Sequence, residues 1–67
     1  MIRGIVKEYD RLKGFGFITG QDVEDYFVHI SELREYLKER GLMTGQRVSF
    51  DVGYDMKGDK AINVRMD

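Results

Sequence analysis

Residues 15–19, Phe-Gly-Phe-Ile-Thr, alternate strictly, and this alternation limits what the chain can fold into more than any other feature. Successive side chains of an extended strand point to opposite faces, so Phe15 and Phe17 share one face while Gly16 and Ile18 share the other. Two assignments are open. Either the phenylalanines form the core, as most phenylalanines do, or the glycine side lines a tightly closed sheet and the rings face solvent.

Residues 26–30, Tyr-Phe-Val-His-Ile, form a second predicted strand that bears on this choice. An inward row of Tyr, Val and Ile leaves Phe27 and His29 together on the outside. The opposite assignment buries a histidine and exposes Val28, so the outward assignment is favoured. If the two strands are neighbours, their outward rings merge into one exposed surface made of Phe15, Phe17, Phe27 and His29.

Contiguous exposed aromatic side chains usually mark a binding surface. Unpaired nucleobases stack on aromatic rings with about 1–3 kcal/mol per base, and nearby ammonium groups hold the phosphates. Lys7 and Lys13 flank the predicted surface. The pattern therefore favours a protein that binds single-stranded nucleic acid, with the buried-phenylalanine alternative still open.

The remaining segments predict an all-β domain with one helix. Residues 31–41 have helical spacing, and we expect a helix of two to three turns with Ser31 as its N-cap. Ile62, Val64 and Met66 are expected on one face of the last strand. Five short strands with a helix after the third predict a single domain, residues 1–67, closed into a small barrel. The other strands are predicted at 2–9, 47–54 and 61–66.

Composition narrows the function. The 67 residues carry 11 Lys and Arg against 12 Asp and Glu, a formal net charge of −1, so binding must rest on a local arrangement of groups. The chain has no cysteine and one histidine, and we expect no disulfide, no metal and no cofactor. No segment resembles a signal peptide or a membrane span, which predicts a cytoplasmic protein without a membrane partner.

Three carboxylates, Asp22, Glu24 and Asp25, fall in one predicted loop. Such a group can bind a divalent ion or supply an acid and base pair, but acidic loops are ordinarily only solvated. No nucleophile or second histidine accompanies them. We therefore expect no enzyme and no small-molecule substrate.

Two motifs give the chain a family resemblance. Residues 13–18, Lys-Gly-Phe-Gly-Phe-Ile, and residues 26–30 resemble the two ribonucleoprotein-type motifs of the cold-shock domain, a single-stranded nucleic-acid-binding variant of the OB-fold. The likeness spans nearly the whole chain, because residues 4–10 stand where the family has Gly-x-Val-Lys-Trp-Phe-Asn, residues 45–52 match its fourth strand and residues 60–64 match its fifth. It implies a five-stranded antiparallel OB-fold barrel and an RNA-chaperone-like role in cold shock or gene expression. The sequence leaves the oligomeric state open, and a monomer is the default expectation.

The resemblance also implies which residues contact the ligand. Tyr36 could replace an aromatic side chain of the family's loop after strand three, although packing against the barrel is the alternative for a tyrosine at helical spacing. The implied nucleic-acid-binding residues are Lys7, Lys13, Phe15, Phe17, Asp25, Phe27, His29, Tyr36 and Lys57.

Two departures distinguish this chain from the family. Glu8 stands where the family has an exposed tryptophan, and Ile30 where it has phenylalanine. Two stacking rings are thereby lost, and Glu8 adds a negative charge near the phosphates. We expect a lower affinity and an altered base preference. The rival hypothesis is a protein-interaction module of the same barrel class that has lost nucleic-acid binding.

Overall fold

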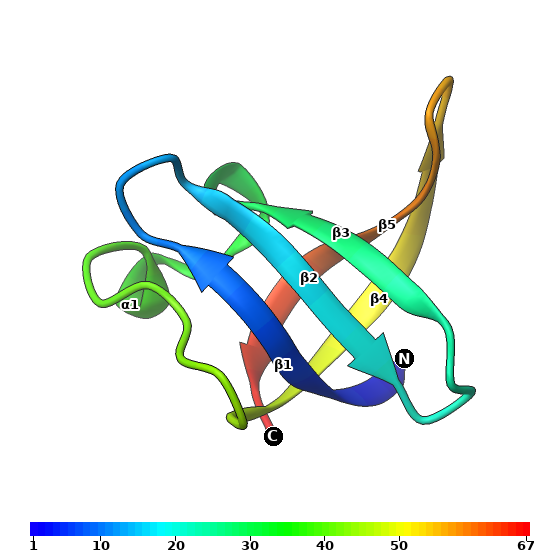
Figure 1. Ribbon diagram of the computed structural model, residues 1–67, viewed down its shortest axis with the longest axis horizontal. Coiled ribbons are helices and arrows are strands. Elements are labelled where there is room, and N and C mark those ends of the chain that lie inside the picture. Colours follow the sequence, from blue (N-terminus) through cyan, green and yellow to red (C-terminus); the bar gives the residue numbers. More distant parts are fainter.

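The computed structural model describes residues 1–67 as a closed barrel of five strands in the order β1-β2-β3-β5-β4, with β1 also pairing with β4 (Figure 1). All pairs are antiparallel except β3 with β5. This confirms the predicted all-β, five-stranded barrel. The strands are β1 Ile2–Asp10, β2 Phe15–Gly20, β3 Asp25–His29, β4 Arg47–Asp55 and β5 Gly58–Met66.

The face of β2 that carries Gly16 and Ile18 points into the barrel interior. Gly16 is buried and Ile18 is fully inaccessible, whereas Phe15 and Phe17 keep 37% and 36% of their surface exposed. The outward assignment of the two phenylalanines is therefore confirmed. Eleven residues make up the core: Val6, Ile18, Tyr26, Val28, Leu33, Leu37, Leu42, Val48, Phe50, Ala61 and Val64.

At Gly16 the backbone of β2 lies too close to that of β1 to leave room for a side chain. A Cβ at this position would lie 2.6 Å from the Cα of Tyr9 and closer still to the carbonyl oxygen of Glu8. Both are backbone atoms of a paired strand and cannot rotate away. Glycine is therefore required here by the approach of two backbones.

The segment between β3 and β4 departs from the prediction. The two-to-three-turn helix is wrong: the structure has a 3-10 turn at Ile30–Glu32 and a single α-helical turn, α1, at Glu35–Lys38. Leu33 lies between them in extended conformation and forms a bridge with Val64 of β5. This tertiary pairing outweighs the helical spacing of the sequence.

The predicted caps change with the helix. The side chain of His29, rather than that of Ser31, caps the 3-10 turn, and Arg34 occupies the N-cap position of α1 without a side-chain hydrogen bond. The segment still closes one end of the barrel, because Leu33, Leu37 and Leu42 are buried in the core.

Strand β5 also departs from the prediction. Ile62, Val64 and Met66 do not all share a face, since Ala61 and Val64 are both buried while Ile62, between them, is only half-buried. The pairing with β4 shifts register here, and Asn63 has a positive φ of 53°. The extra residue of this bulge breaks the alternation and turns both Ala61 and Val64 inward.

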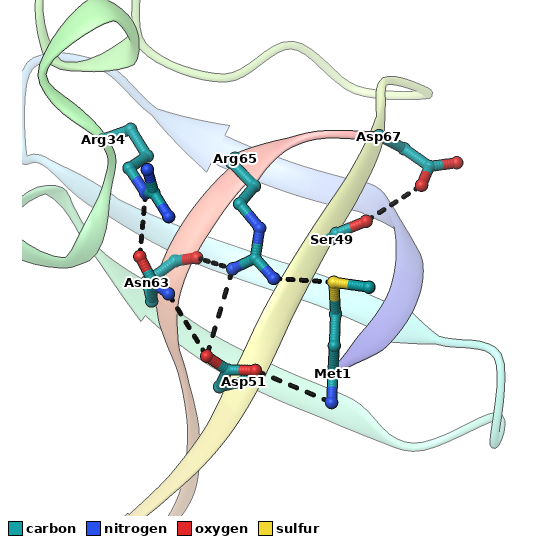
Figure 2. A network of polar contacts seen from close by, with 7 residues as sticks. All are labelled: Met1, Arg34, Ser49, Asp51, Asn63, Arg65 and Asp67. Carbon is teal, nitrogen blue, oxygen red and sulfur yellow. Dashed lines mark hydrogen bonds and ion pairs between the residues drawn. The ribbon is translucent and has the colours of Figure 1, made fainter.

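A polar network covers this bulge and links the chain ends to the β4–β5 face (Figure 2). Asp51 accepts a hydrogen bond from Asn63 and faces the Arg65 guanidinium and the amino terminus. Arg34 donates to the Asn63 side chain at 2.8 Å. Asparagine tolerates the left-handed conformation better than most residues, and these bonds hold it there. None of the residues in Figure 2 belongs to the predicted binding surface.

The helical content is limited to these short turns. No helix in the structure has the length and apolar character needed to cross a membrane.

The close approach at Gly16 can be tested by Gly16→Ala. We expect the free energy of unfolding to fall by about 3 kcal/mol, because an overpacked backbone contact cannot relax. Urea unfolding followed by far-UV circular dichroism measures it.

Gly53→Ala is the matched control. The Cβ added there would meet only the Ile62 side chain, at 2.9 Å, which can move. We expect a loss of about 1 kcal/mol or less. Equal losses in the two variants would contradict the constraint at Gly16.

Candidate nucleic-acid interface

Four rings gather on the outside of β2 and β3, and we call them the aromatic patch: Phe15, Phe17, Phe27 and His29. Antiparallel pairing sets Phe15 opposite His29 and Phe17 opposite Phe27. The Phe27 ring lies centrally, 5.8 Å from Phe15 and 5.9 Å from Phe17 between centroids. The structure thus brings together the four rings that the two alternating strands predict to be neighbours. Their separations are typical of interacting aromatic pairs.

His29 is held in place at the end of β3. Its Nδ1 accepts a hydrogen bond from the backbone N–H of Ser31 at 3.1 Å, which begins the 3-10 turn. The Ser31 hydroxyl lies 2.9 Å from the same nitrogen. Because Nδ1 is an acceptor, the imidazole hydrogen lies on Nε2, on the other side of the ring. The ring therefore enters the patch with a fixed orientation.

Lys13 and Lys57 flank the patch in two separate hollows. Lys13, in the β1–β2 turn, lines a hollow with Phe15 and Phe17. Lys57, in the β4–β5 turn, lines a second hollow with Phe17 and Phe27. Neither lysine forms an ion pair in the structure, and both are exposed. Both predicted lysines are thus placed beside rings, where a phosphate could follow the bases.

Lys60 also lines the second hollow, and sequence reasoning missed it. It pairs with Phe27 through the parallel contact between β3 and β5. No local pattern identifies this neighbour, since the two residues are far apart in the chain. Its ammonium lies 3.8 Å from Asp55, so its charge is partly balanced.

Lys7 and Asp25 contact each other across the edge of the patch. The Lys7 Nζ donates to Asp25 Oδ2 at 2.9 Å, and the Thr19 hydroxyl donates to Asp25 Oδ1 at 2.8 Å. The Lys7 hydrogen bond, then that of Thr19, lowers the pKa of the Asp25 carboxyl, and the same contact raises the pKa of Lys7. The sequence singled out both residues but did not indicate this pairing.

Tyr36 lies away from the patch. Its ring is 54% exposed, and its hydroxyl accepts a hydrogen bond from the Met66 backbone N–H at 2.9 Å. Met66 is six positions along β5 from Lys60, the partner of Phe27, or about 20 Å at the rise of an extended strand. The structure therefore does not bring Tyr36 to the four rings.

The structure also shows where Ile30 and Glu8, the two departures from the family motifs, lie. Ile30 is half-buried and packs against the core, so it adds no ring to the patch. Glu8 is exposed on β1, directly opposite Phe17 in the pairing with β2.

The acidic loop has no metal-like arrangement. Asp22 accepts a hydrogen bond of 2.5 Å from the Tyr26 hydroxyl, which lowers the pKa of Asp22 and raises the pKa of Tyr26 to about 12. Asp25 is engaged by Lys7 and Thr19. No group of three or more His, Cys, Asp or Glu side chains is placed to share a metal ion.

The Lys7–Asp25 contact predicts a pH effect. Asp25 has a lowered pKa in the folded state, so its contribution to stability is present above the ordinary aspartate pKa near 4 and is lost as pH falls through the lowered value. In Lys7→Gln we expect the Asp25 pKa to rise towards that ordinary value. Carboxyl NMR shifts recorded from about pH 6 to about pH 2 measure it. Asp22 is the internal control, because Tyr26 holds it, and an unchanged Asp25 pKa would contradict the assignment.

Comparison with known proteins agrees with this geometry. The family model described as "'Cold-shock' DNA-binding domain" matches residues 2–66. The chain is 47% identical over 66 residues to "Cold shock-like protein" of Aquifex aeolicus, covering 96% of this chain and 91% of that protein. It is 42% identical over 65 residues to "Cold shock protein CspC" of Bacillus subtilis, covering 97% of each. It is 38% identical over 64 residues to "Major cold shock protein" of Streptococcus pyogenes serotype M1, covering 96% and 94%. A closed five-stranded barrel, the aromatic patch on β2 and β3, and a match along almost the full length together show that the chain belongs to the cold-shock domain family.

Proposed function

We propose that this protein binds single-stranded RNA or DNA by stacking unpaired bases on the aromatic patch, without catalysing a reaction. The observation that carries the proposal is the patch itself, a contiguous group of partly exposed rings on two hydrogen-bonded strands. The family match supports nucleic-acid binding over the protein-interaction alternative. We further propose that the protein acts as a monomer in the cytoplasm.

Stacking accounts for most of the affinity in this proposal. Each base on a ring contributes about 1–3 kcal/mol, and the rigid strands keep the rings in place before the ligand arrives. Near the patch, Lys7 is paired with Asp25 and Lys60 with Asp55. Lys13 and Lys57 are therefore the lysines beside the patch that can bind phosphates without first breaking an ion pair.

The biological effect follows from selective binding to the unpaired state. Base pairing hides the faces that the patch stacks on, so the protein binds an open strand and not the duplex. At a free protein concentration of about 100 times Kd, each bound molecule shifts the opening equilibrium of a hairpin by about 2.7 kcal/mol. This is enough to melt weak secondary structure in RNA, which is a chaperone-like role that needs no nucleotide hydrolysis.

Truncation of the rings tests the stacking. Phe27→Ala removes the ring that contacts both other phenylalanines, and we expect the Kd for a short oligothymidine to rise about tenfold or more. Phe17→Ala should weaken binding by about fivefold or more. Fluorescence anisotropy of a labelled strand measures both.

Met43→Ala is the control for loss of exposed apolar surface. Met43 is 70% exposed and lies in the connection between α1 and β4. This connection lies beyond the edge of β1 that faces away from β2. We expect its Kd to stay within about twofold of the wild type. Phe17→Ala and Phe27→Ala binding as tightly as Met43→Ala would contradict stacking on the patch.

The salt dependence of binding tests the proposed phosphate contacts. If Lys13 and Lys57 neutralise two phosphates, log K should fall against log salt concentration with a slope of about −1.4. Lys13→Gln and Lys57→Gln should each make the slope shallower by about 0.7. Arg40→Gln, at an exposed cation beyond α1, should leave it unchanged. A steep slope that survives both lysine changes would show that other cations hold the strand.

A further inference from the structure

Glu8 reaches the face of the aromatic patch through an irregularity in β1. The pairing with β2 sets Val6 opposite Ile18 and then, after a register shift, Glu8 opposite Phe17. Val6 and Ile18 are both buried, so strict alternation from Val6 would turn Glu8 inward. The extra residue, Lys7, reverses the phase and places Glu8 on the same outward face as Phe17.

The Glu8 carboxylate is available to a ligand. It is exposed and forms no ion pair or hydrogen bond, while the adjacent Lys7 is paired with Asp25. Asp10, the next outward carboxylate on β1, accepts hydrogen bonds from the turn that follows. An open hollow lies beside Phe17, and Glu8 forms part of its wall.

A base stacked on Phe17 therefore presents its edge to the Glu8 carboxylate, which accepts no hydrogen bond from the protein. Directly opposite residues have Cβ atoms about 5 Å apart, so the glutamate side chain reaches the edge of a base lying on the ring. An ionised carboxylate only accepts hydrogen bonds, and its two oxygens suit a pair of adjacent N–H donors.

The four bases differ in what they offer to such a group. Thymine and uracil have one N–H between two carbonyl oxygens, which the carboxylate repels. In cytosine and adenine the amino group adjoins a ring nitrogen that is an acceptor. Guanine alone has adjacent donors, N1–H and the N2 amino group, on its Watson–Crick edge.

We propose that Glu8 is a specificity-determining residue that selects guanine at the base position over Phe17, through a bidentate contact with N1–H and the N2 amino group. The inference rests on the proposed function, because a base must first stack on Phe17. The same carboxylate repels phosphates and the carbonyl oxygens of thymine and uracil. It therefore lowers the affinity for strands of thymine or uracil and raises the relative affinity for a strand with one guanine. Glu8 thus adds base selection to the stacking on Phe17.

Binding of heptathymidine and of the same strand with a central guanine tests the proposal. For the wild-type protein we expect the guanine strand to bind about fivefold more tightly or better, the lower range for a bidentate base contact. Glu8→Gln keeps the size of the side chain and its exposed position, but replaces one acceptor oxygen by a donor. We expect the guanine advantage to fall below about twofold, with affinity for heptathymidine maintained or raised.

Glu39→Gln is the matched control. It removes one negative charge from an exposed position after α1 and should keep the full guanine advantage. A strand with 7-deazaguanine, which retains the Watson–Crick edge, should bind as guanine does. A strand with hypoxanthine, which lacks the N2 amino group, should lose most of the advantage. Matching uridine strands of RNA should show the same order, since the edge that is read is common to both nucleic acids.

The outcomes separate the two proposals. Equal affinity of the wild type for the two strands, or a guanine advantage that survives Glu8→Gln, overturns the role of Glu8 and leaves the stacking function intact. Loss of the advantage with 7-deazaguanine also overturns it, because a cation would then be reading N7. If neither strand binds the wild type, the proposed function fails and the inference fails with it.

Discussion

The approach of β2 to β1 at Gly16 is the constraint on which the rest of this structure depends. No side chain fits between the two backbones there, so the strands close tightly only with a glycine on the inner face of β2. With Gly16 and Ile18 inside, alternation requires Phe15 and Phe17 outside. The aromatic rings inside the barrel are those of Tyr26 and Phe50, whose centroids lie 5.2 Å apart. The exposed rings are thus a direct consequence of how the barrel closes.

The proposed binding surface combines rings on paired strands with two unpaired lysines, Lys13 and Lys57. The rings of the aromatic patch lie on paired strands, and the His29 ring is fixed by the Ser31 N–H. Two of the four lysines at its edge, Lys7 and Lys60, are paired with carboxylates, and the whole chain has a net charge of −1. Affinity that comes from stacking is less sensitive to salt than affinity from phosphate contacts, and it depends on bases being unpaired. In the proposed function, selectivity for open strands arises from stacking on the rings, and polar groups beside the rings add a further source of preference among bases.

Sequence reasoning predicted the fold and the shared face of the four rings because both depend on the local alternation of side chains along single strands. The residues of β2 and β3 show their inner and outer faces within five or six positions, and the two motifs indicate the family. It failed where contacts between distant segments override local spacing. Leu33 has helical spacing with Leu37, yet its bridge to Val64 ends the helix that was expected there. Ile62 was expected on the same face as Val64, but the bulge at Asn63 turns Ala61 inward in its place.

The sequence by itself determined the barrel class and the family resemblance, and it favoured the outward direction of the four rings, because these follow from alternation within short strands and from two motifs. The buried side of β2 confirms that direction. Only the tertiary structure decided which polar groups stand beside those rings. The register shift in β1 puts Glu8 opposite Phe17, and the parallel contact of β3 with β5 puts Lys60 beside Phe27. The tertiary structure also separates Tyr36 from the patch, because the Tyr36 hydroxyl accepts a hydrogen bond from the Met66 backbone N–H. Register and strand order depend on how the whole barrel closes, and no single segment of the chain contains that information.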